Sequence, residues 1–291
     1  MVVRALLEAK AAVDTCLPDG SGALFTAGKN SHLDVVKLLI AAGANTELVR
    51  RDGASSLYAA CLGGSAEVVS ELVRANADPD VATATGATPL FLSAQKGFVD
   101  IAKALIVAGA AVNQARENGA TPLHMACEKG HQEIVYELIV AQANVNKSMP
   151  SGETPLLAAA CRGHLVACKT LLQAGADATM RMAGNTALEW VTHKCESEEQ
   201  EDCRDLLATW SDMSQEHKRV VKAYGWAYHE LPFWQRIEHH RYVALRSQTT
   251  AAAVSLPDLP HEIISLLAGA IDIHKRRRRY STLDDVFYYN M

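Results

Sequence analysis

The sequence predicts an all-α solenoid, a stack of short helix pairs, followed by a helical C-terminal extension. One observation is a glycine that returns after 33 residues four times and then after 32, at Gly20, Gly53, Gly86, Gly119, Gly152 and Gly184. Another is that apolar residues between these glycines recur at i, i+3 and i+4, the period of a helix with one buried side. Because one unit of this length cannot bury its apolar side alone, the period indicates units stacked in a row.

Each repeat is expected to begin with a polar turn and a capped helix. The recurring glycine gives the turn a positive φ angle, which other residues adopt only at a cost. In three repeats threonine and proline follow, at Thr88-Pro89, Thr121-Pro122 and Thr154-Pro155. Threonine caps a helix N-terminus and proline fits the first helical turn, so these pairs predict where the first helix of a repeat begins.

A second helix is predicted after a second glycine. Gly97, Gly130 and Gly163 stand where a left-handed residue would end the first helix. The pairs Ile134-Val135 and Leu138-Ile139 then show helical apolar spacing. The unit is therefore a turn followed by two helices.

The most complete repeat resembles the ankyrin repeat. It contains Thr121-Pro122-Leu123-His124-Met125-Ala126, which matches the T-P-L-H-x-A core of that 33-residue unit. The resemblance implies an ankyrin-repeat solenoid over residues 1–210, with a partial first repeat, about five full repeats and a degenerate last one. Residues 211–255 are expected to form a helical extension and a linker, and residues 256–291 an amphipathic helix with a basic tail.

The two ends of the predicted array depart from the repeat. Residues 1–14 have the pattern of a second helix whose first helix is missing, so we expect preceding chain, a partner or a second copy to cover this edge. Residues 195–202, which are strongly acidic, are expected to form a lengthened solvated loop, and residues 203–210 the last second helix.

Composition narrows the class of function. A formal net charge of −5 gives no general attraction to nucleic acid or to anionic membranes. No apolar stretch is long enough to insert into a membrane. Seven cysteines without paired spacing indicate a reducing compartment, so a cytoplasmic or nuclear location is predicted.

The residues that could carry chemistry have structural explanations instead. His124 is the only histidine at its repeat position and is expected to hydrogen-bond between neighbouring loops. His193, Cys195 and Cys203 do not have the spacing of a closed zinc site. With no phosphate-binding glycine motif either, the sequence predicts a protein that is not an enzyme and has no cofactor.

Two tail segments suggest interactions. Leu259, Pro260, Glu262 and Ile263 resemble the L-P-x-E-I opening of an F-box, which docks on the adaptor of cullin-type ubiquitin ligases. An amphipathic helix that packs on the array would explain the same residues. The basic run is expected to be a nuclear localisation signal, a docking patch for an anionic partner, or a solvated helix end. It consists of Lys275, Arg276, Arg277, Arg278 and Arg279.

The resemblance also implies a partner-binding surface, because ankyrin arrays usually bind proteins on the concave side. The residues expected there are Leu62, Leu92, Gln95, Lys96, Met125, Glu128, Lys129 and Arg162. Three of them, Leu62, Leu92 and Met125, would be apolar anchors within a charged rim. The predicted function is a non-catalytic protein–protein interaction scaffold. The alternative is a substrate-recognition subunit of a cullin-type ubiquitin ligase that recruits through its tail.

Overall fold

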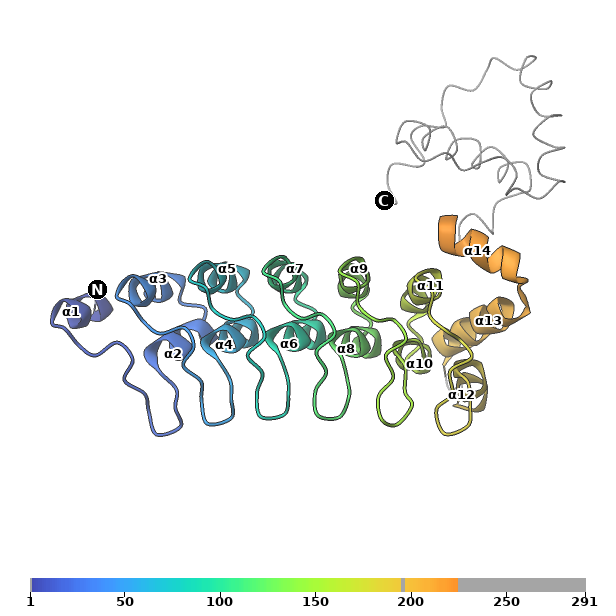
Figure 1. Cartoon of the computed structure of the whole chain (residues 1–291), viewed down its shortest axis with the longest axis horizontal. Helices are drawn as coiled ribbons and strands as arrows, with labels where there is room; N and C mark the ends of the chain where they lie inside the picture. Colours follow the sequence, from blue (N-terminus) through green and yellow to red (C-terminus); the bar gives the residue numbers. More distant parts are fainter. Residues whose placement is uncertain (1, 195–196, 225–291) are drawn as a thin grey trace, which may run out of the picture. The chain divides into compact units, whose positions relative to one another are not determined.

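The computed structural model describes residues 2–194 and 197–224, and residues 1–218 form one compact unit. Within it, helices alternate between two parallel rows (Figure 1). The first helices of the repeats are α2 (Ala23–Lys29), α4 (Ser56–Gly63), α6 (Pro89–Lys96), α8 (Pro122–Lys129), α10 (Pro155–Cys161) and α12 (Ala187–Lys194). The second helices are α3 (Leu33–Ala41), α5 (Ala66–Arg74), α7 (Val99–Val107), α9 (Gln132–Val140), α11 (Leu165–Gln173) and α13 (Glu198–Asp212).

Hairpin loops join each second helix to the next first helix and project beyond the row of first helices (Figure 1). Across the described residues there is no named strand, and extended pairing is confined to isolated bridges such as Val49 with Ser55. The predicted all-α solenoid is therefore confirmed.

Side-chain caps fix the start of α4, α6, α8 and α10, and the three threonines among them are the predicted caps. Ser55, Thr88, Thr121 and Thr154 each accept a hydrogen bond from the main-chain N–H three residues later, at 3.1–3.3 Å. All four are buried, so each cap satisfies a donor that water cannot reach. A proline occupies the first turn of α6, α8 and α10.

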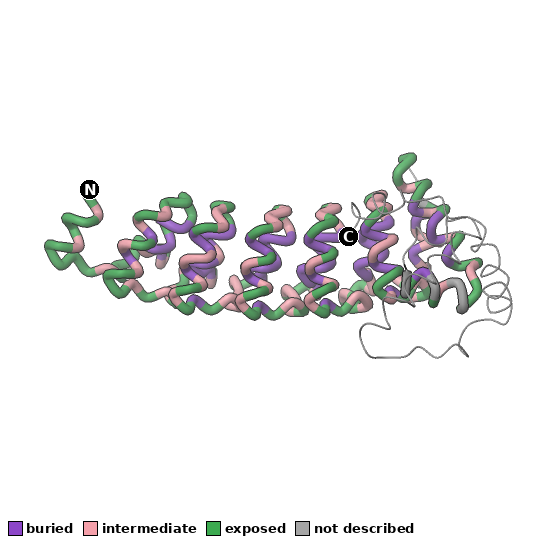
Figure 2. Tube along the Cα trace, turned by 90° about the horizontal axis from the view of Figure 1, so that it is seen from above, coloured by how far each residue is buried: buried purple, intermediate pink, exposed green. Residues whose placement is uncertain are grey.

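The core lies between the two rows and continues from repeat to repeat (Figure 2). Each first helix packs on the next first helix and on its own second helix, so a repeat is covered by its neighbours. The largest fully buried side chains are Phe91, Leu57, Leu72, Leu90, Ile101, Leu105, Leu123, Ile134, Leu138, Leu156, Leu171 and Leu172.

Polar side chains at one loop position connect successive repeats. Each accepts a hydrogen bond from a main-chain N–H 31 residues later, at 2.7–3.2 Å. The acceptors are spaced by 33 residues and are Asp14, Glu47, Asp80, Asn113 and Asn146. This ladder holds the loops in register and was not among the features predicted from the sequence.

Histidines make a second periodic contact between successive repeats. The Nε2 atoms of His131 and His164 lie 3.3 and 3.2 Å from the carbonyl oxygens of Gln95 and Glu128, one repeat earlier. In the last repeat Gln200 takes this place, and its Nε2 donates to the carbonyl oxygen of Cys161 at 2.6 Å. The same inter-repeat link is thus kept with a different side chain.

The ends of the array differ from the expectations in two details. The acidic run is not a loop from Glu198 onwards, because Ser197 caps α13 and its first turn holds three glutamates. Carboxylates are stabilised near a helix N-terminus, so the acidic residues favour the helix itself. Helix α10 ends at Cys161 with Arg162 as its C-cap, one residue before the predicted Gly163.

At the other end, α1 (Val2–Glu8) buries none of its residues. The side chains of Val2 and Leu6 are 72% and 53% exposed, which agrees with the expected uncovered edge. Beyond α13, α14 (Gln215–Tyr224) belongs to the predicted helical extension. The boundaries predicted at residues 210 and 255 stay predictions, and the remainder of the extension lies outside the described residues.

Candidate functional site

The candidate site is the inner face, which we define as the surface formed by the hairpin loops and the exposed sides of the first helices. Residues 33 positions apart occupy the same place in successive repeats, so they form lines along this face. The first line holds Leu62, Gln95, Glu128 and Cys161. The second line holds Lys96, Lys129 and Arg162.

Six of the eight residues expected to bind a partner are accessible on these lines. Leu62, Lys96, Lys129 and Arg162 are exposed, whereas Gln95 and Glu128 are partly exposed. Leu62 offers the largest apolar surface among them, with 42% of it exposed.

The other two expected anchors are mostly buried. Leu92 is 4% exposed and Met125 is 9% exposed. Met125 packs in a cluster with Phe91 and two alanines, against Tyr58 and Met149 of neighbouring repeats. Met125 therefore fills space between repeats, and both side chains offer a partner little surface.

Ion pairs connect two repeats across the inner face. Glu128 Oε1 lies 3.1 Å from Lys129 Nζ in its own repeat and 3.4 Å from Arg162 Nη2 in the next. All three side chains are substantially exposed, so the pairs contribute little to stability. Their effect is to place a partly neutralised carboxylate between two cations.

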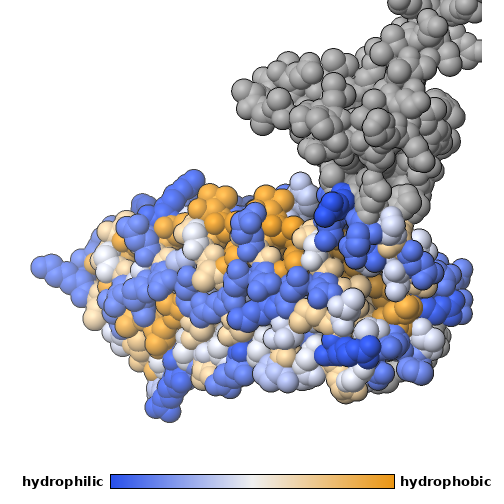
Figure 3. All heavy atoms as spheres, turned by 45° about the vertical axis from the view of Figure 1, so that its right-hand side comes forward, coloured by the Kyte–Doolittle hydropathy of each residue, from blue (hydrophilic) through white to orange (hydrophobic). Residues whose placement is uncertain are grey.

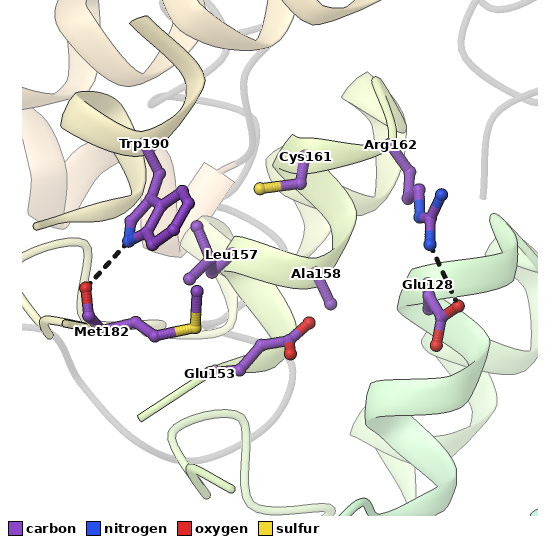
Figure 4. A pocket seen from close by; sticks show the side chains of 8 residues that line it. All are labelled: Glu128, Glu153, Leu157, Ala158, Cys161, Arg162, Met182 and Trp190. Atoms are coloured by element: carbon purple, nitrogen blue, oxygen red, sulfur yellow. Dashed lines mark hydrogen bonds and ion pairs between the residues drawn. The ribbon is translucent and has the colours of Figure 1, made fainter. Parts of the chain in front are cut away.

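A pocket of about 420 Å³ opens beside this network, between α8, α10 and α12 (Figure 4). Its lining residues are Glu128, Glu153, Leu157, Ala158, Cys161, Arg162, Met182 and Trp190. The indole Nε1 of Trp190 donates to the carbonyl oxygen of Met182 at 2.8 Å, which fixes the ring as one wall. Glu128 and Arg162 form the opposite wall.

The pocket lies where one repeat has a small residue at a position that other repeats fill with a large one. Two repeats place Leu92 and Met125 there, and both side chains are buried. The next repeat has Ala158 at this position, and the last has Trp190. The short alanine side chain leaves space that the tryptophan borders and does not fill.

Glu153 is the unusual charge in the pocket. The same position in three preceding repeats holds Ala54, Ala87 and Ala120, which are 3%, 5% and 3% exposed. Within the described residues, the Glu153 carboxylate has neither a hydrogen bond nor an ion pair. Burial and the nearby charge of Glu128 raise its pKa, although Arg162 opposes the shift.

His124 has the structural role that the sequence predicted. Its Nδ1 accepts a hydrogen bond from the N–H of Thr121 at 3.2 Å, and its Nε2 lies 3.3 Å from the carbonyl oxygen of Glu153. The ring thereby joins two neighbouring loops. Burial lowers the pKa of His124 to about 4, so the imidazole is neutral at pH 7.

Of the three positions considered for zinc, the structure describes His193 and Cys203. Cys203 is buried and its Sγ lies 4.0 Å from Sγ of Cys168, on α11. Among the described residues, no group of three or more histidine, cysteine or acidic side chains is arranged to hold a metal ion. Cys195 lies outside the described part of the chain.

The tail residues of the two other predicted sites, 259–263 and 275–279, also lie outside the described part of the chain. Their roles stay predictions. None of the described helices combines the length and apolar character needed to cross a membrane.

The sequence predicted neither Trp190 as a binding residue nor the pocket that Trp190 forms with Glu153. A signal was present at both residues, since each departs from the residue type that its repeat position holds elsewhere. The arrangement can accept one side chain of a partner, with apolar contacts on the Trp190 side and a charge contact at Glu153.

Comparison with known families agrees with the repeat pattern and the stacked helix pairs. A family model described as three copies of the ankyrin repeat matches residues 1–83, 57–149 and 133–215. No curated protein matches the chain. Because the matched ranges together span residues 1–215 of 291, the chain belongs to the ankyrin repeat family.

Proposed function

We propose that the chain is a non-catalytic scaffold that binds a protein partner on its inner face. Ankyrin repeats are generally protein–protein interaction modules. The observation that supports this face is the alignment of exposed and partly exposed side chains in two lines along successive first helices. An extended partner surface can contact several repeats there at once.

The chemistry of the lines suits protein recognition. Leu62 gives an exposed apolar contact, and Lys96 gives a charge one repeat further along. Neither side chain takes part in the described hydrogen bonds or ion pairs between repeats. Changing them therefore leaves the caps, the ladder and the core intact.

The second helices of the repeats, which we call the outer helix row, provide a control surface. Hydrophobic side chains gather there above a band of hydrophilic ones (Figure 3). Val107 on α7 is 88% exposed and Lys37 on α3 is also exposed. The double variant Val107→Glu/Lys37→Glu consequently makes the same chemical changes as Leu62→Glu/Lys96→Glu, on the other row.

The full chain and the two double variants are each used to recover partners from the native cell. The affinity of each purified partner for the three proteins is then measured. We expect the inner-face variant to lose a partner that the outer-row variant retains, with both variants folded by circular dichroism. A partner set that is the same for all three proteins would refute the proposal.

Recruitment to a cullin-type ubiquitin ligase is a second candidate, supported by the F-box-like residues of the tail. Full-chain Leu259→Ala/Pro260→Ala would test it in the same experiment. Loss of ligase components from this variant alone would support recruitment by the tail. Their retention, or their absence from the wild-type sample, would contradict it.

A further inference from the structure

We infer that the pocket between α8, α10 and α12 binds the side chain of a lysine or arginine on the protein partner. This inference rests on the proposed function, because it names the chemistry of one contact on the inner face. The carboxylate of Glu153 would receive the cationic group, while Trp190 and Ala158 would contact the methylene stem.

Glu153 places a partly buried charge where the fold does not need one. Three repeats bury alanine at this position, so the fold itself does not require a carboxylate there. The glutamate is partly buried and, within the described residues, has no counter-ion of its own. A half-buried carboxylate is stabilised when a cation or hydrogen-bond donor reaches it.

Arg162, the cation that lines the pocket, is already paired with another carboxylate. Arg162 Nη2 lies 3.4 Å from Glu128 Oε1. Arg162 and its ion-pair partner Glu128 form one wall of the pocket. The Glu153 carboxylate lies between that wall and the opposite one, which Met182 and Trp190 form (Figure 4). Because Arg162 and Lys129 both pair with Glu128, the carboxylate of Glu153 is the charge of the lining that can receive a positively charged side chain of a partner.

The order of surfaces in the pocket also matches the shape of a lysine or arginine side chain. A lysine or arginine side chain is long, with an apolar stem and a charged end. The pocket provides the matching order of surfaces, with the indole of Trp190 and the thioether of Met182 near one end and the carboxylate of Glu153 beyond them. An aromatic ring also attracts a cation that passes over its face.

The test uses the full chain and three peptides, acetyl-Ala-Ala-X-Ala-Ala-amide with X as lysine, arginine or norleucine. Norleucine has nearly the length of lysine and no charge, so it isolates the contribution of the cationic group. Binding is followed by NMR at the ¹³C-methyl signal of Met182 and the ¹⁵N–H signal of the Trp190 indole, assigned with Met182→Leu and Trp190→Phe.

We expect saturable shifts with the lysine and arginine peptides, and about tenfold weaker binding of the norleucine peptide, the size of one charge-assisted contact. Glu153→Ala and Glu153→Gln should reduce binding of the lysine peptide by a similar factor. Glu117→Gln removes an exposed carboxylate of the preceding hairpin loop and should leave that binding unchanged. Equal binding of all three peptides, or equal effects of the Glu153 and Glu117 variants, would overturn the inference.

A thermal melt of Glu153→Ala shows whether any loss of peptide binding comes from a loss of stability. Because alanine occupies this position in three other repeats, Glu153→Ala should melt no lower than the wild type. A lower melting temperature would assign Glu153 a structural role and overturn the inference. The inner-face variant Leu62→Glu/Lys96→Glu leaves the pocket lining unchanged, so the peptide result separates failure here from failure of the proposed function.

Discussion

The imidazole Nε2 of His131 lies 3.3 Å from the carbonyl oxygen of Gln95, one repeat earlier in the stack. This contact holds the ring over the end of α6, where Gly97 is the C-cap with a φ angle of 78°. A Cβ atom at Gly97 would lie 2.6 Å from Cε1 of His131. The glycine is therefore required both by its backbone angle and by the histidine.

Gly97→Ala is expected to destabilise the array more than Gly109→Ala. Gly109 also has a positive φ angle, of 88°, but its Cβ would meet no atom within 4 Å. The control should lose about 1 kcal/mol from the backbone angle alone. Gly97→Ala should lose a further ~1–2 kcal/mol, because the ring must move and its hydrogen bond is lost.

Urea unfolding followed by circular dichroism measures both losses. A His131→Ala background supplies the decisive comparison, since removal of the ring should reduce the cost of Gly97→Ala to that of the control. If the extra cost persists without the ring, the contact between His131 and Gly97 is not its cause.

Stability should fall in mildly acidic solution because His124 is buried in its neutral form. Burial lowers its pKa from 6.5 to about 4 in the folded chain. Between these values the unfolded chain binds a proton that the folded chain does not, so the free energy of unfolding decreases as the pH falls. The loss begins near pH 6.5 and reaches about 3 kcal/mol at pH 4 and below.

The measurement compares the urea unfolding free energy at pH 7.0 and pH 5.5 for the wild type and for His124→Leu. Leucine occupies the same position in the next repeat, as Leu157. The wild type should lose about 1 kcal/mol more than the variant over this interval. An identical pH dependence in the two proteins would show that His124 titrates with an ordinary pKa.

Buried thiols should resist alkylation. Burial raises the pKa of Cys61 to about 12 and also raises the pKa of Cys127, and both side chains are fully buried. Iodoacetamide reacts with the thiolate, so at pH 8 these two residues should react about a thousandfold more slowly than an accessible thiol. Cys16 is exposed and provides that reference.

Peptide mapping by mass spectrometry after timed labelling gives the rate at each cysteine. In denaturant all of these cysteines should react at similar rates, which controls for peptide recovery. Rapid native labelling of Cys61 or Cys127 would mean that the repeats around them open far more often than a packed core allows.

Much of the fold could be predicted from local residue patterns. The glycine period, the Thr-Pro pairs and the apolar spacing each depend on residues within one repeat, and stacking then follows because a single repeat cannot bury its apolar side. The role of His124 was predicted from its position in the repeat, although the Glu153 carbonyl that its ring approaches belongs to the next repeat. The polar ladder was equally periodic in the sequence, at Asp80 and its equivalents, and could have been found by comparing repeats.

Local residue patterns specify the repeat, its caps and the general position of the inner face. Which residues of that face a partner can reach depends on how the repeats pack, because exposure depends on side chains one repeat away. Leu92 and Met125 were expected to be anchors, yet both are buried, and Met125 packs against side chains of neighbouring repeats. Conversely, the pocket forms where Ala158 is too small to fill the same space, and Trp190 of the next repeat borders what is left.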